Sequence, residues 1–289
     1  MPAGKRAPAM STIIEQVRTK LIDAIDSDQL TLPTLPEVAL HVREAAQDPN
    51  VSVASLSAVI ARDAAITARV IKVSNSPLFR GSSAIENLRM ATTRLGINYT
   101  CNLATGVAMK QMFQATTDIV DTMLRETWAH STDIAGIAHA LAKGCPRLQA
   151  DQASLAGLTH RIGVLPILTF AEEHRKLLAN VDILNEVIEA IHPEIGTRIL
   201  QAWNFPEELV NVPKQYQDFS REIPAPDYAD LVTVASLQCA QGCDHPLAGI
   251  DLSTVNAFGR LGLSQPVDEE QEESKQFIEH IELAVAAYN

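Results

Sequence analysis

The chain has 289 residues, of which 46% are hydrophobic, 20% charged and 4% aromatic, and its formal net charge is −12 at pH 7. This length can bury a large core in one domain or two. The acidic balance and the lack of any cluster of Lys and Arg argue against a nucleic-acid partner. No apolar run reaches the roughly 20 residues that a membrane span needs.

The chain carries features of a protein from a reducing compartment. Lys5 and Arg6 precede no hydrophobic core of a signal peptide, and four cysteines are few for this length. We therefore expect a cytoplasmic protein that meets other proteins or small molecules and binds neither nucleic acid nor a membrane.

Apolar residues recur at helical spacing almost everywhere, which predicts an all-α fold. A loose tail over 1–11 precedes a first helix that runs to about residue 25. Leu32–Pro33–Thr34–Leu35–Pro36 reads as a stiff turn before the next helix. The clearest seam is Gln114–Thr117, so we expect an N-terminal lobe over 12–115 and a C-terminal bundle over 116–289. Within the first lobe, later helices are expected at 53–61, 64–74, 84–95 and 97–113.

The C-terminal part is predicted to be helical throughout. A long helix over 118–143 ends at Gly144, and Asp151 caps the next, which carries His160 and bends at Pro166. The remaining helices are expected near 181–190, 193–203, 206–217, 228–242, 252–262 and 268–287.

Three histidines, His130, His160 and His192, fall on three separate predicted helices. A helical bundle could bring them together, and a dinuclear metal site in such a bundle needs imidazoles to hold the ions and carboxylates to bridge them. The alternative is three unrelated histidines, each satisfied by ordinary hydrogen bonds. The spacing alone favours unrelated histidines, whereas the local motifs around each histidine favour a common site.

The motifs resemble those of the HDOD family, a bacterial signalling module related to HD phosphohydrolases and HD-GYP phosphodiesterases. The likeness covers roughly residues 12–245 and is specific as a set. It rests on Leu32–Pro36, on Asp63 with Arg69, Val70, Asn75 and Ser76, on Ala91 and Arg94–Leu95–Gly96, on Trp128–Ala129–His130–Ser131, on Ala156–Gly157–Leu158–Thr159–His160–Arg161–Ile162–Gly163, and on His192–Gly196 with Leu200, Trp203 and Pro206.

The resemblance implies an HD-like multi-helix bundle with an additional N-terminal helical lobe. It also implies a signalling surface on the N-terminal lobe, although Asp63 and Asn75 can equally be read as caps at the two ends of one helix. The residues assigned to this surface are Leu32, Pro33, Leu35, Pro36, Asp63, Asn75 and Ser76.

The departures from the HD pattern bear on catalysis. The central His–Asp pair of active HD enzymes reads His160–Arg161, and a guanidinium stays protonated and cannot ligate a metal. A paired histidine expected after Pro206 reads Gln215–Tyr216, and no Gly–Tyr–Pro triplet follows. The candidate ligands that remain are His130, His160, His192 and, by a loose alignment, Asp230.

Three interpretations of this remnant stay open. It is a vestigial polar pocket, or an anion pocket in which Arg161 with His130, His160 and His192 holds a phosphate or carboxylate, or a mononuclear three-histidine metal site. We expect no cofactor, with a divalent Zn, Fe, Mg or Mn ion as the alternative.

Other candidate site residues are less strongly supported. Cys239 and Cys243 share a helix face at i and i+4 with His245 beyond, but buried thiols in a helix are commoner than metal ligands at this spacing. Ser131 points about 100° away from His130, which excludes a nucleophile pair. His41, His139 and His174 are expected to be surface or satisfied core residues.

These observations predict a non-catalytic signalling module that works through contacts. Its expected partners are signalling proteins in trans, such as a kinase, a receiver or a cyclic-nucleotide signalling protein, and an anionic small ligand. The alternative is a metal-dependent phosphohydrolase acting on a nucleotide or phosphate ester, which Arg161 argues against.

Overall fold

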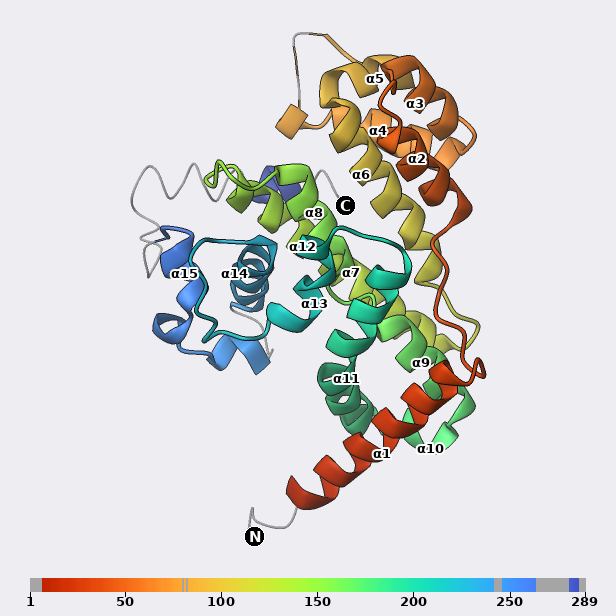
Figure 1. Ribbon diagram of the computed structural model, residues 1–289, viewed down its shortest axis with the longest axis vertical. Coiled ribbons are helices and arrows are strands. Elements are labelled where there is room, and N and C mark those ends of the chain that lie inside the picture. Colours follow the sequence, from red (N-terminus) through yellow and green to blue (C-terminus); the bar gives the residue numbers. More distant parts are fainter. Residues whose placement is uncertain (1–6, 80, 82, 242–245, 264–280, 286–289) are drawn as a thin grey trace.

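The computed structural model describes residues 7–79, 81, 83–241, 246–263 and 281–285 (Figure 1). These residues form helices and connecting loops, with no β-strand among them. The prediction of an all-α fold is therefore confirmed. Figure 1 shows helices α2 to α6 grouped at one end of the molecule, beside a larger bundle built from the other helices.

The N-terminal group consists of α2 (Glu37–Gln47), α3 (Val53–Ile60), α4 (Ala64–Ser74), α5 (Leu88–Leu95) and α6 (Ile97–Met109). Each helix turns an apolar face inward, as expected of amphipathic helices in a small bundle. Their shared core contains buried side chains from all five helices, among them Val42, Leu56, Val70, Ala91 and Leu103.

The larger bundle is built on α7 (Asp118–Ala142), α8 (Ala150–Thr159), α9 (Val164–Glu173), α11 (Val181–Ala202) and α14 (Tyr228–Ala240). Its core forms a second cluster, which adjoins the first because Ala135 of α7 and Leu158 of α8 are buried in the core of the N-terminal group. The shorter elements are η1 (Pro77–Phe79), η2 (Lys110–Met112), α10 (Arg175–Leu178), α12 (Glu207–Val210), α13 (Val212–Gln215), η3 (Pro246–Gly249), η4 (Leu252–Thr254) and α15 (Asn256–Arg260).

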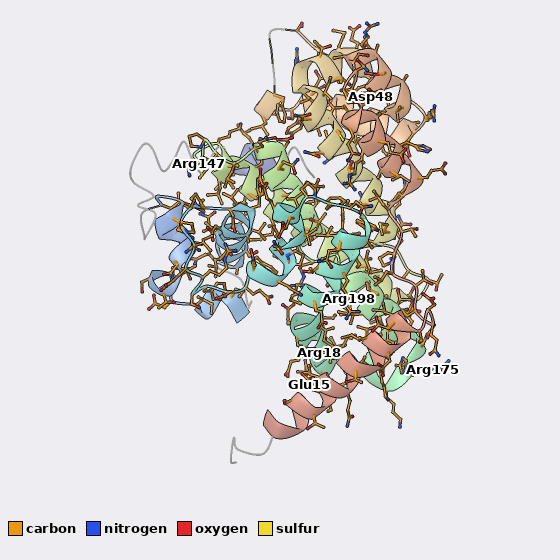
Figure 2. All side chains as sticks on the ribbon, viewed as in Figure 1. Glu15, Arg18, Asp48, Arg147, Arg175 and Arg198 are labelled. Atoms are coloured by element: carbon orange, nitrogen blue, oxygen red, sulfur yellow. The ribbon has the colours of Figure 1, made fainter. Side chains whose placement is uncertain are left out.

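The first helix differs from its prediction in extent and in position. Helix α1 (Ala7–Asp26) begins inside the segment that was expected to be a tail. It packs along α11, with Leu21 fully buried in the core of the larger bundle. Arg198 on α11 contacts Asp26 at 3.0 Å, and Figure 2 shows Arg18 on α1 near this interface. The predicted N-terminal lobe over 12–115 therefore loses its first helix to the C-terminal bundle.

Helix α11 is continuous where two helices were predicted. Pro193 lies inside it, although a proline lacks the N–H that the helix ladder needs. Packing against α1, α9, α10, α12 and α13 outweighs this local penalty. Arg18 also donates to the Ala190 carbonyl at 3.2 Å, one turn before the proline.

The break between α8 and α9 falls at 160–163, earlier than the predicted bend at Pro166, which is accommodated in the first turn of α9. Two glycines bring this segment close to its neighbours. A Cβ on Gly157 would lie 2.5 Å from the Cα of Ala135 on α7. A Cβ on Gly163 would overlap the His192 carbonyl of α11. The end of α8 is thereby held against α7, and the turn that follows His160 is held against α11.

Several helix limits also differ from their predictions. Helix α5 starts after Asn87, whose side chain accepts from the Met90 N–H, instead of at 84. The helix predicted at 206–217 is divided into α12 and α13, and Pro213 lies in the first turn of α13. The helix predicted at 252–262 is η4 and α15. Of the helix predicted at 268–287, residues 281–285 are helical and 268–280 and 286–287 lie outside the described residues.

One described segment is long and apolar enough, by length and composition alone, to cross a membrane. It covers Ala150–Glu173, which contains α8 and α9, and 89% of its apolar window is buried inside the bundle. Such burial is typical of the core helices of a globular bundle.

Candidate functional site

The three predicted histidines come from three helices, and two of them lie against one tyrosine. His130 lies on α7, His160 ends α8 and His192 lies on α11. The His130 and His160 ring centroids are 5.9 Å apart. Tyr216, which ends α13, has its ring centroid 5.0 Å from that of His160 and 6.0 Å from that of His192. Tyr216 thus stands between two of the predicted site residues.

Tyr216 is the residue that replaces the paired histidine of the HD pattern. Its hydroxyl lies 3.2 Å from Nε2 of His192 and accepts a hydrogen bond from Nε2 of Gln217 at 2.9 Å. Burial raises the pKa of Tyr216 to about 12, so the phenol is neutral at physiological pH. From the sequence, Tyr216 was only the absence of an expected histidine ligand, whereas the structure shows that its side chain fills the space beside His192.

Arg161 is engaged by a carboxylate that sequence reasoning missed. Its Nη2 lies 2.5 Å from Oε1 of Glu189, on the outer part of α11. The other oxygen of Glu189 accepts from Gln217 at 3.1 Å and lies 3.8 Å from Nε2 of His192. Burial opposes the charge of Arg161, but Tyr216 and Glu189 outweigh it and raise the pKa of the guanidinium. The signal in the sequence is that Glu189 precedes His192 by three residues on one helix face.

The two innermost histidines are held neutral. His160 and His192 are both fully buried. Burial, followed by the nearby positive charge of Arg161 and neighbouring imidazoles, holds the pKa of each well below its usual range. Nδ1 of His160 lies 2.6 Å from the Gly157 carbonyl, which fixes that nitrogen as the donor. Its Nε2 and Nδ1 of His192 have no hydrogen-bond partner in the described part of the chain.

Asp230, the fourth predicted ligand, belongs to a different cluster. Its buried carboxylate accepts from Nη2 of Arg260 at 2.6 Å and from Nη2 of Arg221 at 2.7 Å. Asp227, the N-cap of α14, also pairs with Arg221 at 2.7 Å. Burial opposes the charge of Asp230, but the two guanidinium groups outweigh it and lower the pKa of that carboxyl. This carboxylate is therefore saturated by arginines.

The donor set does not fit the metal pair of an HD enzyme. The unpartnered nitrogens of His160 and His192 are the kind of atom that a metal ion would use. However, Arg161 puts a guanidinium beside both, and Asp230 is engaged elsewhere. Across the described ranges, no three His, Cys, Asp or Glu side chains are grouped so as to hold a metal ion. A cation–guanidinium contact is repulsive and the bridging carboxylate is missing.

The remaining candidates fall in several places. Sγ of Cys239 lies 3.9 Å from Nδ1 of His130, a contact between α14 and α7 that the sequence did not predict. Cys243 and His245 lie outside the described residues. His139 is buried in the core, with Nδ1 3.1 Å from both the Ala150 carbonyl and the Ser154 hydroxyl.

The N-terminal family motifs serve packing and capping. Trp203, at the end of α11, donates from Nε1 to the Pro33 carbonyl at 2.9 Å. Leu32 and Leu35 in the same turn are half-buried against the larger bundle. This stiff turn, expected to form part of a signalling surface, therefore joins the N-terminal group to α11.

Asp63 and Asn75 occupy the two ends of α4. Asp63 accepts from the N–H groups of Ala65 and Ile66. Asn75 exchanges two hydrogen bonds of 2.8 Å with the backbone of Ile85. Ser76 is half-buried just beyond this end of the helix. Capping of α4 therefore accounts for the side chains of Asp63 and Asn75 without a ligand.

The fold and the histidine site place the chain among helical proteins of the HD type. The HDOD domain model matches residues 32–219, and the chain belongs to the HDOD family. A curated relative from Treponema pallidum (strain Nichols), which carries no functional name, is 27% identical over 209 residues, or 68% of this chain. The chain spans about 40% of the length of that relative.

Solved structures agree with this family. A protein from Shewanella amazonensis SB2B, named as a proposed metal-dependent phosphohydrolase, is 31% identical with a TM-score of 0.82, and the match covers 96% of this chain and 99% of that one. An HDOD domain protein of unknown function from Geobacter sulfurreducens has a TM-score of 0.66 at 21% identity, covering 94% and 97%. A proposed signal transduction protein from Marinobacter aquaeolei VT8 has a TM-score of 0.65 at 21% identity, covering 95% and 65%.

Proposed function

We propose that this HDOD chain is a non-catalytic signalling module that acts by binding signalling proteins in trans, in the cytoplasm of a bacterium. The observation that carries the proposal is the Arg161–Glu189 ion pair beside His160 and His192. A positive charge from the protein stands next to the imidazoles that an HD hydrolase would use for its ions. The partners in this proposal are a kinase, a receiver or a cyclic-nucleotide signalling protein.

The interior network supports a binding role over hydrolysis. Metal-assisted hydrolysis needs a bound water whose pKa the ion lowers, and an open coordination position for it. Here the space beside His192 is taken by the Tyr216 hydroxyl and the Glu189 carboxylate. An added anion would also have to displace Glu189 from Arg161, so this ion pair weakens the interpretation of Arg161 as an anion receptor.

The second candidate is a metal-dependent phosphohydrolase acting on a nucleotide or phosphate ester. It is supported first by the likeness to the Shewanella amazonensis structure, which is named as a proposed metal-dependent phosphohydrolase and is 31% identical to this chain. The two unpartnered imidazole nitrogens add to it, because a Zn, Fe, Mg or Mn ion would have donors there.

Metal content decides between the two candidates. The untagged protein, purified without chelators, is analysed by elemental mass spectrometry and then assayed with bis(p-nitrophenyl) phosphate in the presence of added Mn²⁺. The proposal expects substoichiometric metal and no turnover above that of His160→Ala. A stoichiometric metal that is lost in His160→Ala, together with turnover lost in the same variant, would establish the hydrolase instead.

A further inference from the structure

A small cavity lies where the N-terminal group meets the larger bundle. Its volume is about 160 Å³, and its walls come from α2, α6, α8 and the segment that follows α11. A cavity of about 150 Å³ holds a molecule the size of benzene. The cavity is therefore large enough for a small ligand, and none of the side chains that line it belongs to the His160 site, although both sites use α8.

Arg43 supplies the charge at this cavity. Its Nη1 donates to the Trp203 carbonyl at 2.8 Å and its Nη2 donates to the Asn204 carbonyl at 2.9 Å. The guanidinium carbon lies 4.0 Å over the ring of Phe205, which also lines the cavity. These contacts tie α2 to the end of α11 and use two of the five N–H groups that an arginine carries.

Arg43 has no counter-ion in the described part of the chain. The ion pairs of these residues join other arginines and histidines to carboxylates, and none includes Arg43. Its side chain is half-buried, and this burial lowers the pKa of its guanidinium. Placing a charge in such a position costs free energy unless an opposite charge pairs with it. The two backbone carbonyls supply partial charges only.

The rest of the cavity suits an anion. No Asp or Glu side chain lines it, and four side-chain amides do, from Gln47, Asn98, Asn102 and Gln152. An amide group can donate hydrogen bonds to an oxyanion without adding charge. Asn102 already donates to Asp151 at 2.9 Å, so the other three amides are the ones left to bind a ligand.

We propose that this cavity binds a small oxyanion, a carboxylate or phosphate about the size of benzene, with Arg43 as its counter-ion. The ligand would accept from the remaining N–H groups of Arg43 and from the amide of Gln152, which also lines the cavity. Because Arg43 belongs to α2 and Gln152 to α8, the ligand bridges the two helical groups. This inference does not depend on whether the His160 site is catalytic.

Thermal unfolding and calorimetric titration with inorganic phosphate and with malonate test the inference, at an ionic strength held constant with sodium chloride. A saturable rise in Tm with at least one anion is expected, because a ligand that binds only the folded state stabilises it. Phosphate alone would indicate a phosphoryl ligand, and malonate alone a carboxylate ligand.

Two variants locate the binding. Arg43→Gln removes the counter-ion, and Gln152→Glu puts a carboxylate into the cavity while leaving the two Arg43 hydrogen bonds in place. Both should weaken binding at least tenfold, and Gln152→Glu should raise the Tm of the ligand-free protein by pairing with Arg43. Gln111→Glu is the matched control, because Gln111 is exposed in η2 and does not line the cavity. The inference would be overturned if neither anion showed saturable binding. It would also be overturned if Gln152→Glu bound the anion as tightly as the parent protein.

Discussion

Arg161 and Glu189 join the end of α8 to α11, with Nη2 of the arginine 2.5 Å from Oε1 of the carboxylate. The arginine side chain is 16% exposed and the glutamate side chain 50% exposed. In an active HD enzyme the residue after this histidine would be a metal-bridging aspartate. At the position where an HD enzyme would bind a metal cation, this protein therefore places the guanidinium cation of Arg161, paired with Glu189.

Arg161→Asp should not restore a metal site. The change removes the guanidinium, but the Tyr216 hydroxyl stays beside His192, and Asp230 stays paired with Arg221 and Arg260. Glu189 also loses its partner and faces a new carboxylate, which costs stability when no metal is bound. We expect substoichiometric metal by elemental mass spectrometry and a loss of about 1–2 kcal/mol in the free energy of unfolding, a reduced figure because Glu189 is half exposed. Stoichiometric metal in this single variant would show that only the ligand set had decayed.

Stability should fall as the pH falls below about 6.5. The pKa of both His160 and His192 is held well below the usual 6.5, so at pH 5.5 the unfolded chain binds more protons than the folded one. Folding stability contributed by these neutral imidazoles is complete above pH 6.5 and is lost as the pH falls. Urea unfolding at pH 7.5 and 5.5 should show this loss, and His192→Asn should reduce it. A stability that rises on acidification over this range would contradict the argument.

The sequence was most informative where a motif had a local physical cause. The caps of α4, the all-α class and the long helix that carries His130 could all be predicted from local sequence pattern, whereas His192 fell between two predicted helices that form one helix in the structure. The Arg161 substitution was also visible, since it stands next to a recognisable histidine. Its partner Glu189 was not, because it is 28 residues away and pairs only when the turn after α8 lies against α11.

The errors in the predicted fold likewise arise where contacts between distant residues decide the structure. The sequence predicted two helices over 181–190 and 193–203, yet α11 continues through Pro193 because its packing on neighbouring helices outweighs a local penalty. Helix α1 precedes the N-terminal group in the chain but packs on α11, a contact across about 170 residues such as the 172 between Asp26 and Arg198. Asp230 was aligned to a ligand position, and only the fold shows that Arg221 and Arg260 occupy its carboxylate.

Trp203→Phe should loosen the join between the two helical groups. The change removes the Nε1–H that donates to the Pro33 carbonyl while it retains most of the apolar ring. A loss of about 0.5–1.5 kcal/mol in the free energy of unfolding is expected, as for one buried hydrogen bond. Trp128→Phe is the matched control, since Trp128 packs on Phe113 with ring centroids 5.1 Å apart. Hydrogen exchange at residues 32–36 should quicken in the first variant alone.

Gly157→Ala should be among the most destabilising single-methyl changes in the chain. The added Cβ would lie 2.5 Å from the Cα of Ala135, and backbone atoms cannot move aside as a flexible side chain can. We expect a loss of about 1–3 kcal/mol by urea unfolding. Gly259→Ala in α15 adds the same methyl group where nothing lies within 4 Å, so its stability should stay within about 0.5 kcal/mol of the parent. Equal effects of the two substitutions would show that α7 and α8 do not approach as closely as the structure places them. A large loss in Gly157→Ala alone would show that the glycine of the histidine motif sets the approach of α8 to α7, and with it the place of His160.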